Sequence, residues 1–316
     1  MTDPSQARCA TLPLPLFAAV MGLSGLGLVW QAAGEHWGLP APIAGAVGLV
    51  SATVFVLLLA GYACKAVIAP RAVLEEIRHP VRINFLPAIS ISLILLGLQA
   101  QSTTPSVSLW LWGSGAALHL ILTVGIVTRW LGGEQPAAAL NPAWFIPAVG
   151  NVLVPLAAAP AGYAQLGWFF FAAGILFWVV LGVMVFHRLI TGPALEPPMR
   201  PTLAVLLAPP SVAFLAWHAL TGDVGTAGTL LFYVAVMTAL LVVAQLPAFA
   251  RLPFFPSWWA YTFPAAAFTV AVFHYSDATG ANVDMLLGLL TGAVTILLLG
   301  VSALTLRALY RGNLNH

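Results

Sequence analysis

Residues 258–264 read WWAYTFP and lead into AAAFTVAVFHY, an apolar run that ends at residue 275. Its proline, Pro264, lies inside what the apolar run predicts to be a membrane-spanning helix. Proline lacks a backbone donor and clashes with the preceding turn, so it bends a helix and leaves carbonyl groups without partners. In lipid such a defect is stable only where protein or a water-filled cavity covers it. The stretch therefore predicts an inner helix of a membrane protein, kinked at Pro264.

The composition also indicates a bilayer. Hydrophobic residues make up 61% of the 316 residues, charged residues make up 6%, and the mean hydropathy is +0.98. So few charges cannot cover the surface of a soluble domain. We therefore expect an all-α membrane protein, a single transmembrane domain over residues 1–316 with short tails, whose surroundings are lipid and which has no nucleic-acid partner.

Ten apolar runs come close to the roughly 20 residues that a helix needs to cross the hydrocarbon core. We expect spans near residues 14–31, 43–62, 82–100, 108–128, 142–159, 163–187, 201–220, 227–245, 257–275 and 285–307.

The basic residues predict the orientation of these spans. All 11 Lys and Arg residues fall on the side of the N-terminus, and the opposite loops carry only acidic charges, at Glu35, Asp223, Asp277 and Asp284. Positive residues favour the cytoplasmic side of a membrane. We therefore expect an even number of spans with both termini in the cytoplasm.

The proline of the opening stretch has a counterpart in every odd-numbered span. The five stretches are PLPLFAAV, FLPAISIS, FIPAVGNV, LAPPSVAF and TFPAAAFT, with Pro15, Pro87, Pro147, Pro209 and Pro264. We expect each proline six or seven residues in from the cytoplasmic end, and the even-numbered spans have no interior counterpart. This recurrence predicts an internal repeat of five helical hairpins with the odd helices inside. The kinked helices either line a pore or bend for packing alone.

The residue before each of these prolines is apolar. These residues are Leu14, Leu86, Ile146, Ala208 and Phe263. An apolar ring with one large aromatic side chain can block ions by dewetting, without a charged gate. The alternative is that Phe263 only packs between helices.

Charge and histidine patterns narrow the class of function. No Asp, Glu, Lys or Arg lies in the middle of a predicted span, whereas coupled transporters usually carry buried ionisable groups there. His119 is expected to be a hydrogen-bonded interior residue, and His218 and His274 are expected near the outer ends of the seventh and ninth spans. Without a Cys/His cluster or a catalytic motif, we expect no enzyme activity, cofactor or metal.

WWAYTFP, the PLP opening of the first span and HPVRINFLP before the third together resemble the tellurite-resistance/dicarboxylate transporter family. That family contains bacterial permeases and the plant guard-cell slow anion channels. The resemblance implies a homotrimer in a bacterial inner membrane, with one pore per subunit along a quasi-fivefold axis of kinked helices. It also implies conduction of small anions such as chloride and nitrate, with Phe263 closing the pore.

The sequence therefore leaves two alternative functions. The first is a gated anion channel. The second is a proton-coupled carrier for dicarboxylates or other organic acids, or a tellurite-resistance permease. A carrier for carboxylates should have a positive side chain near the midplane, and the sequence has none there.

Overall fold

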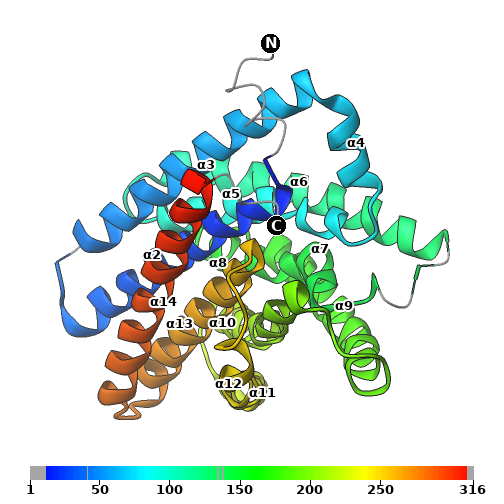
Figure 1. Cartoon of the computed structure of the whole chain (residues 1–316). Helices are drawn as coiled ribbons and strands as arrows, with labels where there is room; N and C mark the ends of the chain where they lie inside the picture. Colours follow the sequence, from blue (N-terminus) through cyan, green and yellow to red (C-terminus); the bar gives the residue numbers. More distant parts are fainter. Residues whose placement is uncertain (1–11, 41, 134, 137–138, 312–316) are drawn as a thin grey trace.

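The computed structural model is helical throughout the residues that it describes, which are 12–40, 42–133, 135–136 and 139–311 (Figure 1). The α-helices are α2 (Ala18–Trp37), α3 (Pro42–Ile68), α4 (Pro70–Arg78), α5 (Ala88–Gln99), α6 (Pro105–Leu131), α7 (Phe145–Val149), α8 (Val154–Ala158), α9 (Ala164–Thr191), α10 (Ala208–Thr221), α11 (Gly225–Ala244), α12 (Leu246–Phe249), α13 (Thr262–Thr279) and α14 (Asp284–Arg311). Helical structure is present at each of the ten expected ranges.

Among the described residues, eight helical segments are long and apolar enough to cross a membrane. They are Leu14–Trp37, Pro42–Ile68, Arg82–Gln99, Pro105–Leu131, Ala164–Thr191, Pro197–Thr221, Gly225–Ala244 and Asp284–Arg311. The apolar segment Pro142–Ala158 is shorter. The ninth expected range holds α13, whose last turns carry the polar residues His274, Ser276 and Asp277.

The helices that contain the aligned prolines lie inside the bundle. Within the most apolar stretch of Leu14–Trp37, Arg82–Gln99 and Pro197–Thr221, between 56% and 72% of residues are buried, against 17% to 33% in the other five candidate spans. Those five expose large apolar side chains, for example Leu49, Ile121, Val183, Leu230 and Ile296. Because exposed apolar side chains are stable in lipid, these five helices form the outer layer, as the sequence predicts.

The prolines lie where an α-helix begins, which differs from the continuous kinked helices that we expected. Short 3-10 segments precede the inner α-helices: η1 (Leu14–Phe17), η2 (Arg82–Phe85), η4 (Pro142–Trp144), η6 (Pro197–Leu207) and η7 (Pro256–Tyr261), with η5 (Gly150–Leu153) between α7 and α8. Pro15 lies in η1, Pro87 is the N-cap of α5, and Pro264 is the third residue of α13. The N–H groups in the first turn of a helix have no acceptor within the helix, so proline, which lacks an N–H, is stable there.

The expected depth of the prolines is therefore wrong in detail. Pro15 is the second residue of its segment, whereas Pro209 follows the 11-residue η6. Pro147 lies within the five-residue α7. The 3-10 segments differ in length, so a proline at the start of an α-helix is not at a constant distance from the end of the bundle.

Small residues let the inner helices approach closely. A Cβ added at Gly22 would lie 2.2 Å from Oγ1 of Thr262, and one added at Gly25 would lie 2.8 Å from Cβ of Ala266. Both positions are on α2, and both contacts are to α13. Close approach through glycine stabilises helix pairs in membranes, where apolar burial alone provides little driving force.

The opening stretch forms η7 and the first turn of α13. Trp259 is buried and donates a hydrogen bond from Nε1 to Oγ1 of Thr305 on α14 (3.0 Å). Thr262 donates a hydrogen bond to the carbonyl oxygen of Trp259 (2.7 Å). These two bonds join the start of α13 to α14 and hold the backbone on which Phe263 is carried.

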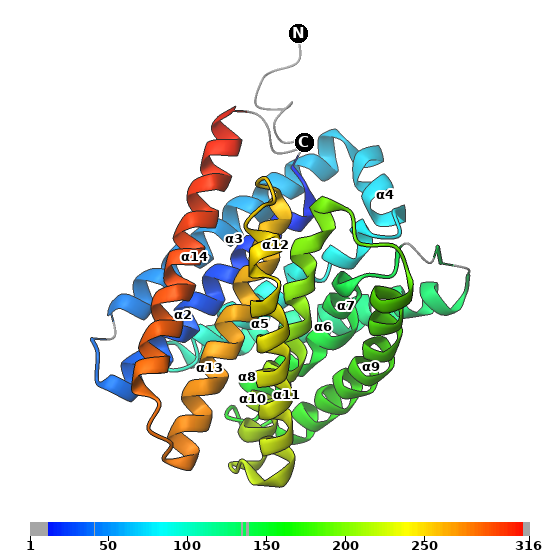
Figure 2. The ribbon, with the colours of Figure 1, turned by 60° about the horizontal axis from the view of Figure 1, so that its bottom comes forward.

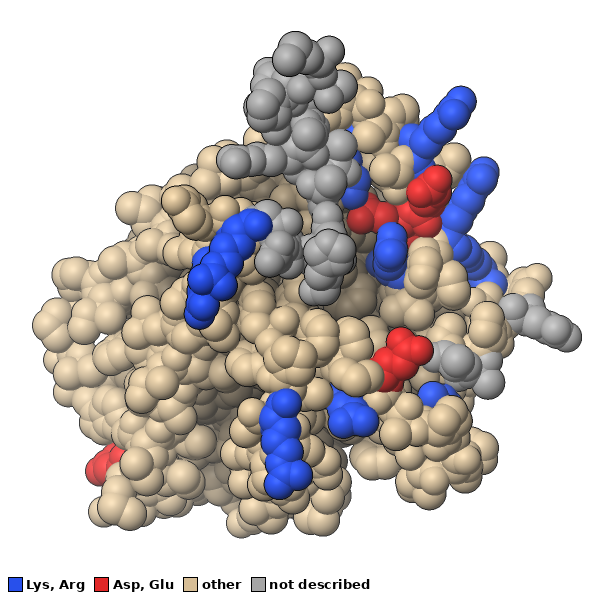
Figure 3. All heavy atoms as spheres, in the orientation of Figure 1, with Lys and Arg blue, Asp and Glu red and all other residues tan. Residues whose placement is uncertain are grey.

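The two ends of the bundle differ in charge. Basic residues occur in the last turns of α3, α6, α9 and α14, and Figure 3 shows Lys and Arg gathered on the face that carries α4. We call this the basic end. Figure 2 shows the turn between α13 and α14 at the opposite end from α4, and we call that the acidic end because it carries Glu35, Asp277 and Asp284.

A buried ion pair joins the basic end of α3 to α4. Nζ of Lys65 lies 2.9 Å from Oε2 of Glu76 on α4 and donates a hydrogen bond to the carbonyl oxygen of Leu12 (2.7 Å). The hydroxyl of Tyr62 donates to the same Glu76 carboxylate (3.0 Å). Because each charge has a partner, the pair is stable although it is buried.

Candidate functional site

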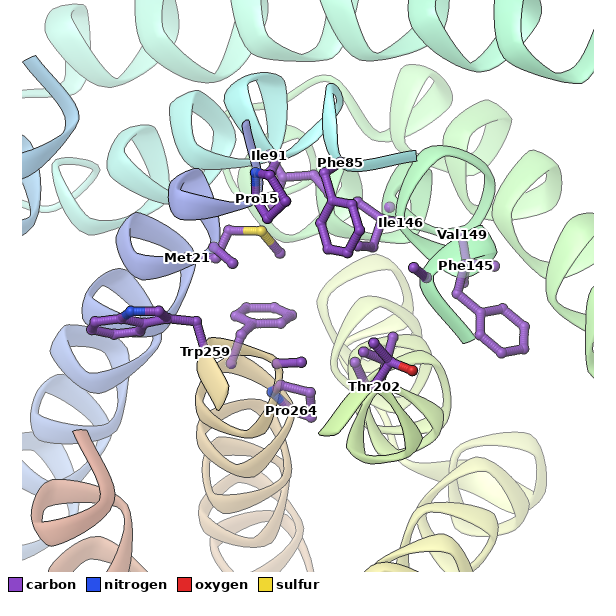
Figure 4. A pocket seen from close by; sticks show the side chains of 18 of the residues that line it. Pro15, Met21, Phe85, Ile91, Phe145, Ile146, Val149, Thr202, Trp259 and Pro264 are labelled. Carbon is purple, nitrogen blue, oxygen red and sulfur yellow. The ribbon is translucent and has the colours of Figure 1, made fainter. Parts of the chain in front are cut away.

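All the proline-bearing segments surround one cavity near the basic end, with a volume of about 80 Å³. Figure 4 shows the side chains around this inner cavity, among them Pro15, Met21, Phe85, Ile91, Ile146, Val149, Thr202, Trp259 and Pro264. Pro15 comes from η1 and Met21 from α2, whereas Trp259 comes from η7 and Pro264 from α13. Segments far apart in the sequence thus meet at one point.

The inner cavity is apolar. None of the described residues that line it is charged, and its hydroxyl groups face the backbone: Oγ1 of Thr202 donates to the carbonyl oxygen of Met199 (2.6 Å). Oγ of Ser257 donates to the carbonyl oxygen of Pro198 (2.5 Å). An ion in this cavity would therefore lose water without gaining a charged partner.

A second cavity of about 430 Å³ opens toward the acidic end. Its wall is formed by α2, α5, α10 and α13, together with residues that follow α5 and α8. Its polar lining consists of Gln31, Glu35, Gln101, Ser102, His218 and His274. This outer cavity is larger and more polar than the inner one.

Three apolar side chains belong to the walls of both cavities: Leu153, Val212 and Phe263. They come from η5, α10 and α13. Phe263 is 8% exposed, and its ring lies beside Gly25, where an added Cβ would be 3.5 Å from Cδ2. These side chains form an apolar septum between the two cavities. Such a constriction can stop ions by excluding water.

Only part of the apolar ring expected from the sequence lines the inner cavity. Ile146, Ala208 and Phe263 line it, but Leu14 and Leu86 do not. Leu14 is fully buried in the core, and Leu86 packs against that core. A 3-10 turn has three residues and an α-turn 3.6, so the residue before a proline faces different directions in segments with different lengths of 3-10 helix.

Of the five aligned prolines, Pro15, Pro209 and Pro264 line the inner cavity, whereas Pro87 and Pro147 do not. Alignment by proline did not indicate Leu153 and Val212. Val212 lies three residues after Pro209, and Leu153 lies six residues after Pro147. A comparison of helix depth, rather than of position next to proline, could have found both residues.

His119 is a fully buried, hydrogen-bonded residue, as the sequence predicts. Its Nδ1 lies 2.9 Å from Oγ of Ser90, and a Cβ added at Gly150 would lie 2.7 Å from its Nε2. On the same helix, Thr123 accepts a hydrogen bond from Nδ2 of Asn151 (3.0 Å). These bonds hold α6 against the inner segments beside the cavity.

Two other histidines, both expected near the outer ends of their spans, lie close together in the wall of the outer cavity. His218 on α10 and His274 on α13 are neighbours in the wall of the outer cavity, with ring centroids 5.7 Å apart in an edge-to-face contact. The two residues are 56 positions apart in the sequence, and only the packing of α10 against α13 brings them together. Within the described ranges, no group of three or more His, Cys, Asp or Glu residues could hold a metal ion.

Comparison with known proteins places these features in a family. The family described as "SLAC1: Voltage-dependent anion channel" matches residues 11–308. The S-type anion channel SLAH2 of Arabidopsis thaliana is 30% identical over 249 residues, which are 77% of this chain and 48% of SLAH2. The guard cell S-type anion channel SLAC1 of the same plant is 26% identical over 277 residues, or 84% of this chain and 50% of SLAC1.

A bacterial relative matches over most of both lengths. The tellurite resistance protein TehA homolog of Haemophilus influenzae is 25% identical over 279 residues, which are 86% of this chain and 84% of that protein. By contrast, the chain spans about half the length of the two plant relatives.

Proposed function

This chain belongs to the SLAC1 family of anion channels and transporters, and we propose that it is a gated channel for small monovalent anions such as chloride and nitrate. The observation that carries the proposal is the apolar septum of Leu153, Val212 and Phe263 between two cavities that open toward opposite ends of the bundle. An inner cavity whose described lining residues carry no charge, closed by apolar side chains, suits passive conduction. Phe263, the largest of the three, is the proposed gate.

The proposed assembly is a homotrimer in a bacterial inner membrane, with one pore in each subunit. Each pore is proposed to be formed by five helical hairpins in quasi-fivefold order, ten spans in all. The meeting of the proline-bearing segments around the inner cavity supports this arrangement. The exposed apolar side chains of α3, α6, α9, α11 and α14 support an outer layer in contact with lipid or other subunits.

Both termini and the basic end are proposed to be cytoplasmic, because positive charge is retained on that side. A test uses Ala194→Cys near the basic end of α9 and Asn282→Cys in the turn between α13 and α14, both at exposed positions. The background carries Cys9→Ser and Cys64→Ser. In intact spheroplasts a membrane-impermeant maleimide should label Asn282→Cys only, and permeabilisation should add Ala194→Cys. Strong labelling of Ala194→Cys in intact spheroplasts would refute this orientation.

Selectivity should follow the ease with which an anion loses water. None of the described residues that line the inner cavity offers a charged partner, so weakly hydrated nitrate should pass at least as easily as chloride. Exclusion of cations is expected from membership of a family described as anion channels. The measurement is the reversal potential of the purified protein in planar bilayers with unequal potassium nitrate and potassium chloride solutions. A reversal potential that follows potassium, or a preference for fluoride over nitrate, contradicts the proposal.

The same recordings separate the channel from a proton-coupled carrier of dicarboxylates or other organic acids. A channel current reverses at the Nernst potential of the anion, whereas the current of a coupled carrier shifts with the proton gradient at constant anion gradient. None of the described residues around the inner cavity is the positive side chain with which a carrier would hold a carboxylate. We therefore expect no shift with the proton gradient in the reversal potential.

A further inference from the structure

The outer cavity is lined by a pair of imidazole rings, one of which, that of His218, also stacks on Phe214. The rings of His218 and His274 are 5.7 Å apart and inclined by 70°. Both line the cavity wall, both are half-buried, and neither ring makes a hydrogen bond to another described residue. Polar atoms at this depth normally have a partner. The ring nitrogens are therefore available to a ligand in the cavity.

Only this pair of histidines can supply positive charge to an anion in the outer cavity, as far as the described lining residues go. Of the described residues that line the cavity, only His218 and His274 can become positively charged, and Glu35 at its mouth is acidic and exposed. The nearby His36 is already bound to two carboxylates, with Nδ1 2.5 Å from Asp277 and Nε2 2.8 Å from Asp284. An acidic mouth repels anions. An anion that enters from this end needs a local positive site.

We infer that His218 and His274 form a proton-linked anion-binding site in the outer cavity, which binds a small monovalent anion at the nitrogen atoms of the two adjacent rings. When the pair takes up a proton, both nitrogens of that ring become donors, and the added positive charge attracts the anion. A bound anion in turn favours the protonated ring, because ligand and proton share one coupling free energy. The nature of the anion rests on the proposed function. The site itself rests on the geometry of the pair.

Other titratable groups lie on the elements that are packed against α10 and α13 at the same end of the bundle. From α2 these are Glu35 and His36, and from the last turns of α13 they are Tyr275 and Asp277. Asp223, Tyr233 and Asp284 complete the set from the turn after α10, from α11 and from α14. The charges of Glu35 and Asp277 also act on His274, so a pH effect must be assigned to the pair by substitution.

The direct test measures binding without conduction. Purified protein labelled with ¹⁵N-histidine is titrated by NMR in nitrate and in gluconate, and the two signals are assigned with His218→Gln and His274→Gln. In nitrate the pH midpoint of the pair should lie higher by about half a unit to one unit, which corresponds to threefold to tenfold tighter anion binding by the protonated form. Equal midpoints in the two salts overturn the inference. This result does not depend on whether the protein conducts.

The second test uses current in the Phe263→Ala background at low salt. When the outer pH falls from 8 to 5.5, the inward flow of nitrate should rise by about threefold to tenfold. His218→Gln with His274→Gln should remove most of this rise. His187→Gln, an exposed histidine at the basic end of α9, is the matched control and should keep it. A rise that survives the double substitution, or that is lost in His36→Gln, overturns the assignment. A background without current contradicts the proposed gate and leaves the NMR test decisive for the pair.

Discussion

Phe263→Ala should produce a standing anion conductance. The substitution removes the largest side chain of the septum between the inner and outer cavities, where Leu153 and Val212 alone would remain. Water can then fill the gap, and the barrier to ions falls because they no longer shed their hydration in an apolar constriction. Each ~1.4 kcal/mol removed from the barrier raises the rate tenfold, so we expect an increase on the order of tenfold to a hundredfold.

The measurement is nitrate or chloride current in planar bilayers or oocytes, with surface expression checked for each variant. Phe263→Leu should stay largely closed because it keeps apolar bulk in the septum. Phe268→Ala is the matched control, since Phe268 lies on the same helix and lines neither cavity. If Phe263→Ala is folded at the surface and carries no more current than the parent, Phe263 is not the gate.

Gly97→Ala should strongly destabilise the protein. Gly97 lies on α5 where it meets α6, and a Cβ added there would lie 2.6 Å from the backbone nitrogen of Trp112 and 3.0 Å from the carbonyl oxygen of Ser108. These are backbone atoms, so no side chain can turn away, and the two helices must move apart. Overpacking of this kind costs about 1–3 kcal/mol, and separating the helices also removes their close contacts.

A matched glycine provides the control for this stability prediction. Gly113 on α6 has nothing within 4 Å of an added Cβ, so Gly113→Ala should be neutral or slightly stabilising. Thermal unfolding of the detergent-purified variants, followed by size-exclusion chromatography, should show a lower midpoint for Gly97→Ala only, by roughly 2–4 °C for each kcal/mol. Equal midpoints for both variants would show that the two helices tolerate a methyl group at this contact.

Much of the fold can be predicted from local features of the sequence. The apolar runs predicted where helical structure would occur, because a long apolar segment in lipid must satisfy its backbone hydrogen bonds within itself. The recurring prolines distinguished inner segments from outer ones for the same reason, and the burial of Leu14–Trp37, Arg82–Gln99 and Pro197–Thr221 agrees with that distinction.

The sequence alone was less informative about the site, because the direction of a side chain depends on the helix type before it. Leu14 and Leu86 precede prolines just as Phe263 does, yet they pack into the core while Phe263 separates the two cavities. The lengths of the 3-10 segments cause this difference, and proline position alone does not specify those lengths.

By itself, then, the sequence determined the membrane environment, the helical segments, the division into inner and outer helices, and the absence of charge from the middle of the predicted spans. These properties follow from hydropathy and backbone chemistry, which act locally along the chain. Only the tertiary structure decided that Leu153, Val212 and Phe263 meet, and that His218 lies beside His274. Such meetings depend on the depth and rotation of separate helices, which are set by the packing of the whole bundle.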